Sequence, residues 1–177
     1  MKIELLDEKI YKGKKLINKY TTEYFYDVEI KENEQGFGFH LTKKSLNKVR
    51  EKQFEDIFLS DWLENPKLFG AIENGKVLGY LELSHEQWNN RMRIANIAVE
   101  EDYRGKGIGK ALMEKAYSVA YEEKARMLIL ETQSCNHKAI SFYKSCGYSV
   151  IGFDLFAYTN TDIENKEFRI EMGKFVA

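Results

Sequence analysis

The sequence is poor in the residues that mark several protein classes. It has two cysteines among 177 residues, too few for the disulfide framework of a small secreted domain. The formal net charge of −1 gives no sign of a general nucleic-acid binder. No apolar run approaches the roughly 20 residues of a membrane span, and the first residues lack the apolar core of a signal peptide. We therefore expect a cytoplasmic protein with no nucleic-acid or membrane partner.

The sequence does contain enough apolar material for a core. Hydrophobic residues make up 44% and charged residues 31% of the chain, a balance that is typical of globular domains. No repeat, low-complexity tract or linker interrupts it, and the glycine-containing residues 35–38 are too few to separate domains. We expect a single domain over residues 1–177.

The N-terminal third shows the weakest pattern. Residues 24–30 are aromatic and β-branched, and Phe37, Phe39 and Leu41 alternate as in a strand. Apolar residues recur at helical spacing over residues 43–64, which predicts a helix that Pro66 closes, because the residue before proline avoids helical angles.

The remaining two thirds are clearer. Asn74-Gly75 between two apolar runs predicts a hairpin, because both turn positions need a positive φ. The patterns then predict a strand at 93–99, a helix at 108–123, a strand at 127–131, a short helix at 137–146 and strands at 148–153 and 168–172. This order predicts an α+β (α/β-like) fold, a mixed sheet with helices on its faces.

Residues 103–110 read Tyr-Arg-Gly-Lys-Gly-Ile-Gly-Lys and join a predicted strand to a predicted helix. The first N–H groups of a helix have no partner within it, and the helix dipole adds positive charge there. A glycine-rich turn at this place can therefore hold a phosphate, and Arg104 and Lys106 add charge beside it. The spacing matches neither a Walker loop nor a dinucleotide fingerprint. A turn that only connects the two elements is the alternative.

Two residues farther along carry polar groups of possible chemical use. Asn136 precedes the short helix, where its amide can cap the helix or bond a ligand. Tyr143 carries a hydroxyl that can give a proton to a leaving group, although its usual pKa is about 10. Taken alone, a helix cap and a packed aromatic ring are the simpler interpretations.

Together these features resemble the GCN5-related N-acetyltransferase (GNAT) family. Arg104, Gly107 and Gly109 match its Arg/Gln-x-x-Gly-x-Gly/Ala signature, and Asn136 and Tyr143 follow at the expected distance. The match covers about residues 68–153. The resemblance implies the GNAT fold, with a central mixed β-sheet of about six or seven strands flanked by helices. It also implies an enzyme that transfers an acetyl group from its co-substrate acetyl-CoA to a primary amine.

The resemblance further implies roles for single residues. The turn would hold the coenzyme pyrophosphate, and the preceding strand would pair with the pantetheine arm and polarise the thioester carbonyl near Ile97. The implied cofactor-binding residues are Ile97, Ala98, Val99, Arg104, Gly105, Lys106, Gly107, Ile108, Gly109, Lys110, Asn136 and Tyr143. Tyr143 would also protonate the departing thiolate. Direct attack by the amine needs no cysteine nucleophile, and the three histidines show no metal-ligand spacing.

A base must accept a proton from the attacking amine, and Glu82 is the catalytic candidate for this step. A water chain that ends at Glu82 or Glu131 would also serve. The other interpretation of Glu82 is a solvated strand residue.

Within the family, the chain looks most like the streptothricin acetyltransferases, over residues 97–99, 103–109, 130–133, 142–143 and 152–154. This likeness implies a small cationic amine, such as streptothricin, as acceptor, and hence antibiotic resistance. That group commonly has acidic residues before Ile-Ala-Val, where this chain has Ala95-Asn96. Other carboxylates remain candidates to line a cation site: Glu55, Asp56, Asp61, Glu82, Asp154 and Asp162.

Two further functions stay open. One is acetylation of a protein N-terminus or lysine, and the other is a non-catalytic acetyl-CoA-binding regulatory domain. A homodimer is expected by analogy alone.

Overall fold

The structure, a computed structural model, describes all residues from 1 to 177. Its strands are β1 (Lys2–Leu5), β2 (Lys15–Asn33), β3 (Gly36–Ile57), β4 (Lys67–Glu73), β5 (Lys76–Glu86), β6 (Arg91–Val99), β7 (Met127–Gln133), β8 (Ser149–Asp154) and β9 (Arg169–Phe175). Its helices are α1 (Glu8–Tyr11), α2 (Ile108–Glu122), α3 (His137–Ser145) and α4 (Asp162–Asn165), with a 3-10 turn, η1 (Glu101–Tyr103).

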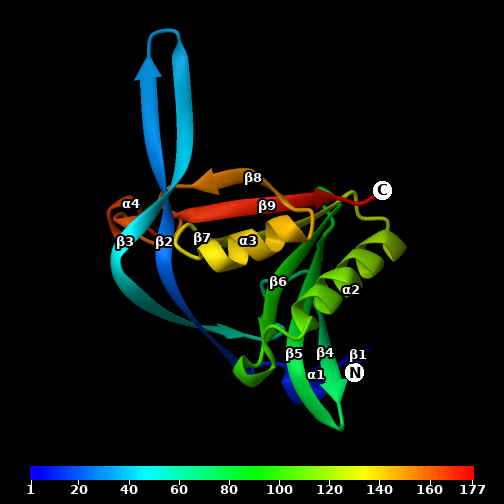
Figure 1. Cartoon of the computed structure of the whole chain (residues 1–177). Helices are drawn as coiled ribbons and strands as arrows, with labels where there is room; N and C mark the ends of the chain where they lie inside the picture. Colours follow the sequence, from blue (N-terminus) through cyan, green and yellow to red (C-terminus); the bar gives the residue numbers. More distant parts are fainter. The chain divides into compact units, whose positions relative to one another are not determined.

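The strands form two sheets. Seven of them are hydrogen-bonded in the order β1-β4-β5-β6-β7-β9-β8, and β2 pairs with β3 in a separate two-stranded sheet (Figure 1). From β1 through β4 and β5 to β6 the pairs are antiparallel, whereas β6 and β7 are parallel. The predicted α+β fold with a mixed central sheet of six or seven strands is therefore confirmed.

Most elements predicted after residue 66 are present within a few residues of their expected bounds. Asn74 and Gly75 have φ values of 50° and 76°, so the turn between β4 and β5 has the two positive angles that Asn-Gly favours. Gly147, with a φ of 85°, follows the end of α3, as expected of a left-handed helix stop.

The helix predicted over residues 43–64 is wrong, because β3 continues as an extended strand to Ile57. The apolar residues that suggested a helical face are largely exposed, with Val49 at 56% and Phe54 at 45%. These residues therefore do not form the buried face of a helix. The backbone of β3 is hydrogen-bonded to β2 instead. Intrinsic propensity is a weak guide where a long-range strand partner is present.

The chain divides into two compact units. The first unit comprises residues 1–18, 54–130 and 173–177, and the second comprises residues 19–53 and 131–172. The expectation of a single domain stays a prediction, and each unit is described by itself.

In the first unit, both faces of the β5–β6 pair are covered. On one face lies α2, which buries Ile108, Leu112 and Ala116. The approach of α2 is close, because a Cβ built on Gly79 would lie 3.3 Å from Cδ1 of Leu112 and 3.4 Å from Cγ2 of Ile108. The other face is covered by a cluster that includes Leu16, Phe58, Leu59 and Leu68. This packing fixes the end of β6 and the start of α2 relative to each other.

In the second unit, α3 packs through Ile140 and Tyr143. The start of α3 is tied to β2, since the N–H of Tyr26 donates to the carbonyl of Ser134 at 2.9 Å. The hydroxyl of Tyr20 donates to Oε1 of Gln133 at 2.5 Å. The β2 strand of the hairpin therefore supports the loop before α3.

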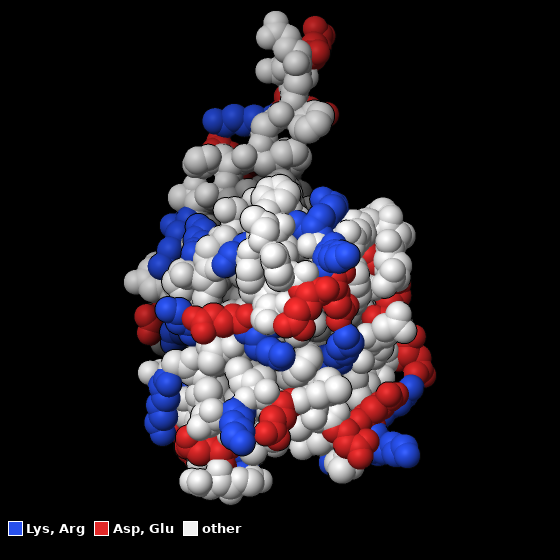
Figure 2. Space-filling view, turned by 90° about the vertical axis from the view of Figure 1, so that its right-hand side faces the viewer, with Lys and Arg blue, Asp and Glu red and all other residues white.

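Lysine and arginine side chains are interspersed with aspartate and glutamate side chains on the face seen in Figure 2. None of the helices is both long enough and apolar enough to cross a membrane.

Candidate functional site

The second half of β6 has a strand partner on one side only. It pairs with β5 along its length, up to Val99, but with β7 only from Arg91 to Arg93. Residues 94–99 therefore present a second edge whose N–H and C=O groups can bind an extended ligand. Ile97, Ala98 and Val99, the predicted partners of the pantetheine arm, lie on this part of β6.

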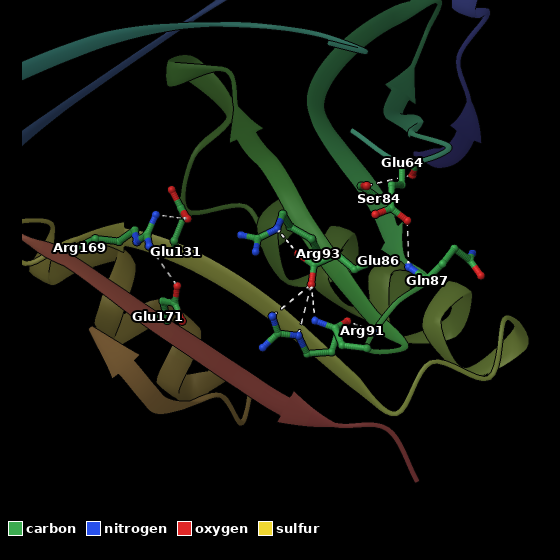
Figure 3. Close-up of polar contacts among 10 residues, drawn as sticks. Glu64, Ser84, Glu86, Gln87, Arg91, Arg93, Glu131, Arg169 and Glu171 are labelled. Carbon is green, nitrogen blue, oxygen red and sulfur yellow. Dashed lines mark hydrogen bonds and ion pairs between the residues drawn. The ribbon is translucent and has the colours of Figure 1, made fainter. Parts of the chain in front are cut away.

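The opposite end of β6 is held by ion pairs. Glu86 of β5 accepts from Arg93 Nε at 2.7 Å and from an Arg91 guanidinium nitrogen at 3.1 Å (Figure 3). The two arginines are the first and last residues of the stretch that pairs with β7. The sheet is thus fixed at one end of β6, and the open edge lies at the other.

The turn between η1 and α2 presents a row of unpaired donors. The backbone N–H groups of residues 105–110 donate to no acceptor of the chain, and α2 begins after Gly107 without a side-chain cap. Gly105 and Gly107 have φ values of 76° and 83°, with open space where a Cβ would lie. Consecutive free N–H groups at the start of a 15-residue helix can bind an anion.

Positive side chains surround this turn. The Nε of Arg104 donates to the carbonyl of Val99 at 3.1 Å, which ties the turn to the end of β6. Lys106 and Lys76 place their ammonium groups 4.8 and 4.9 Å from the ring centre of Tyr103. Sequence reasoning missed Lys76, because only the fold of the β4–β5 hairpin brings it beside Tyr103. A lysine directly after the Asn-Gly turn was the available signal.

Glu82 is fully buried in the first unit, at 0% exposure. Its Oε1 accepts from the N–H of Leu59 at 2.5 Å, and its Oε2 accepts from Nδ2 of Asn96 at 2.7 Å. Burial raises the pKa of this carboxyl, the two hydrogen bonds lower it and the charge of Asp56 raises it, so that the net direction is upward. Glu82 is therefore not the solvated strand residue of the alternative interpretation. A raised pKa makes the carboxylate a better base.

The second unit brings together Asn136 and Tyr143 on α3. Asn136 is the helix cap, since its Oδ1 accepts from the N–H of Ala139 at 3.3 Å. Its amide NH₂ makes no hydrogen bond within the chain and is available to a ligand. The cap and the ligand interpretations of Asn136 are thus compatible.

Tyr143 is packed by the rings of Phe142 and Tyr148, with ring centres 5.5 and 6.4 Å away. Burial, followed by the neighbouring Cys146, raises the pKa of its hydroxyl to about 12. The hydroxyl of Tyr148 is enclosed without a hydrogen-bond partner. Tyr143 is buried, and its raised pKa keeps the hydroxyl protonated at neutral pH.

Most of the carboxylates that could line a cation site already have partners. Glu55 pairs with Lys15 and Asp61 pairs with Lys12. Arg169 lies among three carboxylates, of Glu131, Asp154 and Glu171, each at 3.5 Å (Figure 3 shows Glu131 and Glu171). Asp162 is buried and accepts from the N–H groups of Tyr158 and Thr159. Asp56 and Glu82 have no such cationic partner.

Comparison with known proteins places the chain among acetyltransferases. The family model described as "Acetyltransferase (GNAT) family" matches residues 38–148. A streptothricin acetyltransferase from Escherichia coli is 29% identical over 94% of this chain and 91% of its own length. One from Streptomyces lavendulae is 31% identical over 83% and 80%, respectively.

A solved structure shows the same fold. The crystal structure of nourseothricin acetyltransferase superposes with a TM-score of 0.74 at 24% identity, over 99% of this chain and 98% of the other. The family model and the second relative, together with the glycine turn and the one-sided edge of β6, show that the chain belongs to the acetyltransferase (GNAT) family.

Proposed function

We propose that the protein transfers an acetyl group from acetyl-CoA to a primary amine of a small cationic molecule, streptothricin or a related antibiotic. The proposal rests mainly on the row of unpaired N–H groups at residues 105–110. This row follows the open edge of β6 along the chain. Relatives that match this chain over most of their length are streptothricin acetyltransferases.

The residues of the turn fit the coenzyme. A pyrophosphate needs several aimed donors and positive charge, which the N–H row and the side chains of Arg104, Lys106 and Lys76 supply. The open space beside Gly105 and Gly107 lets the phosphates reach the main chain. The edge of β6 at residues 97–99 aligns the pantetheine arm, and an N–H near Ile97 polarises the carbonyl.

Acetyl-CoA supplies an activated acetyl group as a thioester. Two side chains manage the protons of the transfer. Glu82 accepts the proton of the attacking amine through a water molecule, because its oxygens keep lone pairs beyond those used by Leu59 and Asn96. Tyr143, whose pKa is about 12, gives its proton to the departing thiolate. The amine attacks directly, and no cysteine is acylated.

The carboxylate of Asp56 supports a cationic acceptor. Asp56 is half-buried and has no cationic partner, so a substrate ammonium group would supply the missing charge. The acidic residues common before Ile-Ala-Val in streptothricin acetyltransferases are replaced here by Ala95-Asn96, and Asp56 reaches Asn96 from β3. We infer that Asp56 takes over the electrostatic part of their role.

A thiol-release assay tests the proposal. Purified protein is given acetyl-CoA with streptothricin, with an aminoglycoside, or with a peptide that carries a free N-terminus and a lysine. We expect free thiol with streptothricin and a mass increase of one acetyl group on the antibiotic. Thiol release with the peptide alone would favour protein acetylation instead. Coenzyme binding by calorimetry with no acetylated amine would favour the regulatory domain. The homodimer and the cytoplasmic location stay predictions.

A further inference from the structure

Asn96 lies on an unexpected face of the sheet. Leu83 pairs with Ile94, and Glu82 pairs with Asn96, so β6 carries one extra residue, Ala95, at this point. Neighbours along β5 point to opposite faces, and cross-strand partners share a face. The bulge at Ala95 therefore places Asn96 on the face of Glu82 rather than on the face of Ile94.

A single amide nitrogen then joins two carboxylates. Nδ2 of Asn96 donates to Oε2 of Glu82 at 2.7 Å and to Oδ2 of Asp56 at 3.0 Å. Carboxylate oxygens only accept, so the NH₂ end of the amide must face them. Asn96 is 7% exposed and Glu82 0%, and bonds between such buried groups resist replacement by water.

The second oxygen of Glu82 is held from the opposite side. Leu59 has a φ of 57°, a left-handed angle that costs a bulky residue about 1–2 kcal/mol. Its N–H donates to Oε1 of Glu82 at 2.5 Å. Each oxygen of Glu82 thus faces a donor, which favours the ionised carboxylate, while burial favours the neutral form.

The charged surroundings of Glu82 are simple. From β3 and its extension, the facing groups are the Asp56 carboxylate and the neutral Leu59 N–H, and from β6 the facing group is the neutral Asn96. The Asp56 charge opposes ionisation of Glu82, and the Asn96 amide supports it. No lysine, arginine or histidine is among the groups that shift the pKa of Glu82.

We propose that Asn96 is a positioning residue, whose amide aligns Glu82 with Asp56 and sets the pH range over which Glu82 accepts the proton of the amine. This inference rests on the proposed function, since it assigns Asn96 to the base of that reaction. Asn96 itself touches no reacting atom. Asn96 lowers the pKa of Glu82 and Asp56 raises it, so variants of the two residues should shift the titration in opposite directions.

The test uses two nearly isosteric variants. Asn96→Asp replaces the donor by a third carboxyl and should move the titration of Glu82 to higher pH by about one unit or more. Asp56→Asn removes the opposing charge and should move it to lower pH. Ser84→Ala is the control, because Ser84 is buried on the same face of β5 but bonds the carbonyl of Glu64. It should leave the titration unchanged.

Two measurements are made on each folded variant. The carboxyl of Glu82 is titrated by NMR with ¹³C-labelled glutamate, and Glu82→Gln assigns the signal. The acid limb of kcat is measured at saturating amine, where it reports groups of the bound complex. We expect the limb and the NMR titration to shift together, upward for Asn96→Asp and downward for Asp56→Asn.

Other outcomes would overturn either the role of Asn96 or the proposed function. If the NMR titration of Glu82 does not move, or if it moves while the acid limb stays, the assignment of Asn96 is overturned. A wild-type protein that acetylates no amine would instead overturn the proposed function. The NMR titrations would still accept or reject the coupling of Glu82 to Asn96. The thermal midpoint of each variant separates these effects from unfolding.

Discussion

Two regions of this molecule differ in what holds them in place. The turn at residues 104–110 and the end of β6 present main-chain groups, and their shape depends on glycine angles and on a nearby helix. The β2–β3 hairpin presents side chains, and its strands are 19 and 22 residues long. Local backbone geometry leaves a mark in the sequence, whereas the pairing of two long strands leaves little. The turn was therefore predictable, whereas the strand over residues 43–57 was not.

The largest expected effect lies where β5, β6 and α2 meet. A Cβ at Gly79 would lie 2.8 Å from the backbone carbonyl of Ala98, and the backbone cannot give way as a side chain can. We expect Gly79→Ala to lower the free energy of unfolding by about 3 kcal/mol, measured by urea denaturation. Gly70→Ala is the matched control, since its Cβ would meet only the flexible end of Leu6 at 2.9 Å. Equal losses in the two variants would contradict the close-approach argument.

Tyr143 tests whether the chemistry depends on a single hydroxyl. We expect Tyr143→Phe to lower kcat by about 100-fold or more with coenzyme affinity nearly unchanged, because a general acid contributes to the transition state only. Tyr148→Phe is the control in the same ring cluster. It removes a buried hydroxyl without a partner, so activity should stay and stability should rise slightly. Similar kinetics for both variants would remove Tyr143 from the acid role.

The sequence allowed the sheet, α2, α3 and the turn to be predicted, because Asn74-Gly75, Gly147 and the glycines of the turn need particular backbone angles. It also indicated Asn136 and Tyr143 through their distance from the turn, and Glu82 through its place on a predicted strand. It did not show that Glu82 is buried, because the elements packed on each face of the sheet must be known before the burial of a strand residue can be predicted. Asn96 was beyond prediction, because the bulge at Ala95 reverses the side that alternation assigns to it.

The proposed phosphate-binding role of the turn can be separated from its backbone strain. Gly107 and Gly75 have similar φ values, 83° and 76°, and both face open space. Valine at either position should therefore cost similar stability, about 1–2 kcal/mol. We expect Gly107→Val alone to weaken coenzyme binding, by about tenfold or more, when calorimetry is used to measure it. Equal affinities would mean that the turn is only a connector.

The hairpin side is tested through Thr22, which is 1% exposed on β2. Its hydroxyl lies 2.6 Å from the carbonyl of Cys135 and 3.0 Å from Nδ1 of His137. Thr22→Val keeps the shape but leaves that carbonyl unpaired, and we expect a loss of about 1–2 kcal/mol in urea denaturation. Thr42→Val, at an exposed site of β3, should change stability by less than about 0.5 kcal/mol.

Replacing Lys76 should have the smallest effect on coenzyme affinity. It also separates binding by side chains from binding by main-chain donors. Its exposed ammonium group lies 4.9 Å from the ring centre of Tyr103, where it adds charge near the turn without holding the backbone. We expect Lys76→Ala to weaken coenzyme binding about threefold at low salt and less at high salt, because exposed charges are screened. Lys14→Ala is the matched control, since Lys14 makes the same type of contact with Tyr11 at 4.7 Å. A salt-independent loss at Lys76, or the same loss at Lys14, would mean that main-chain donors account for the charge recognition.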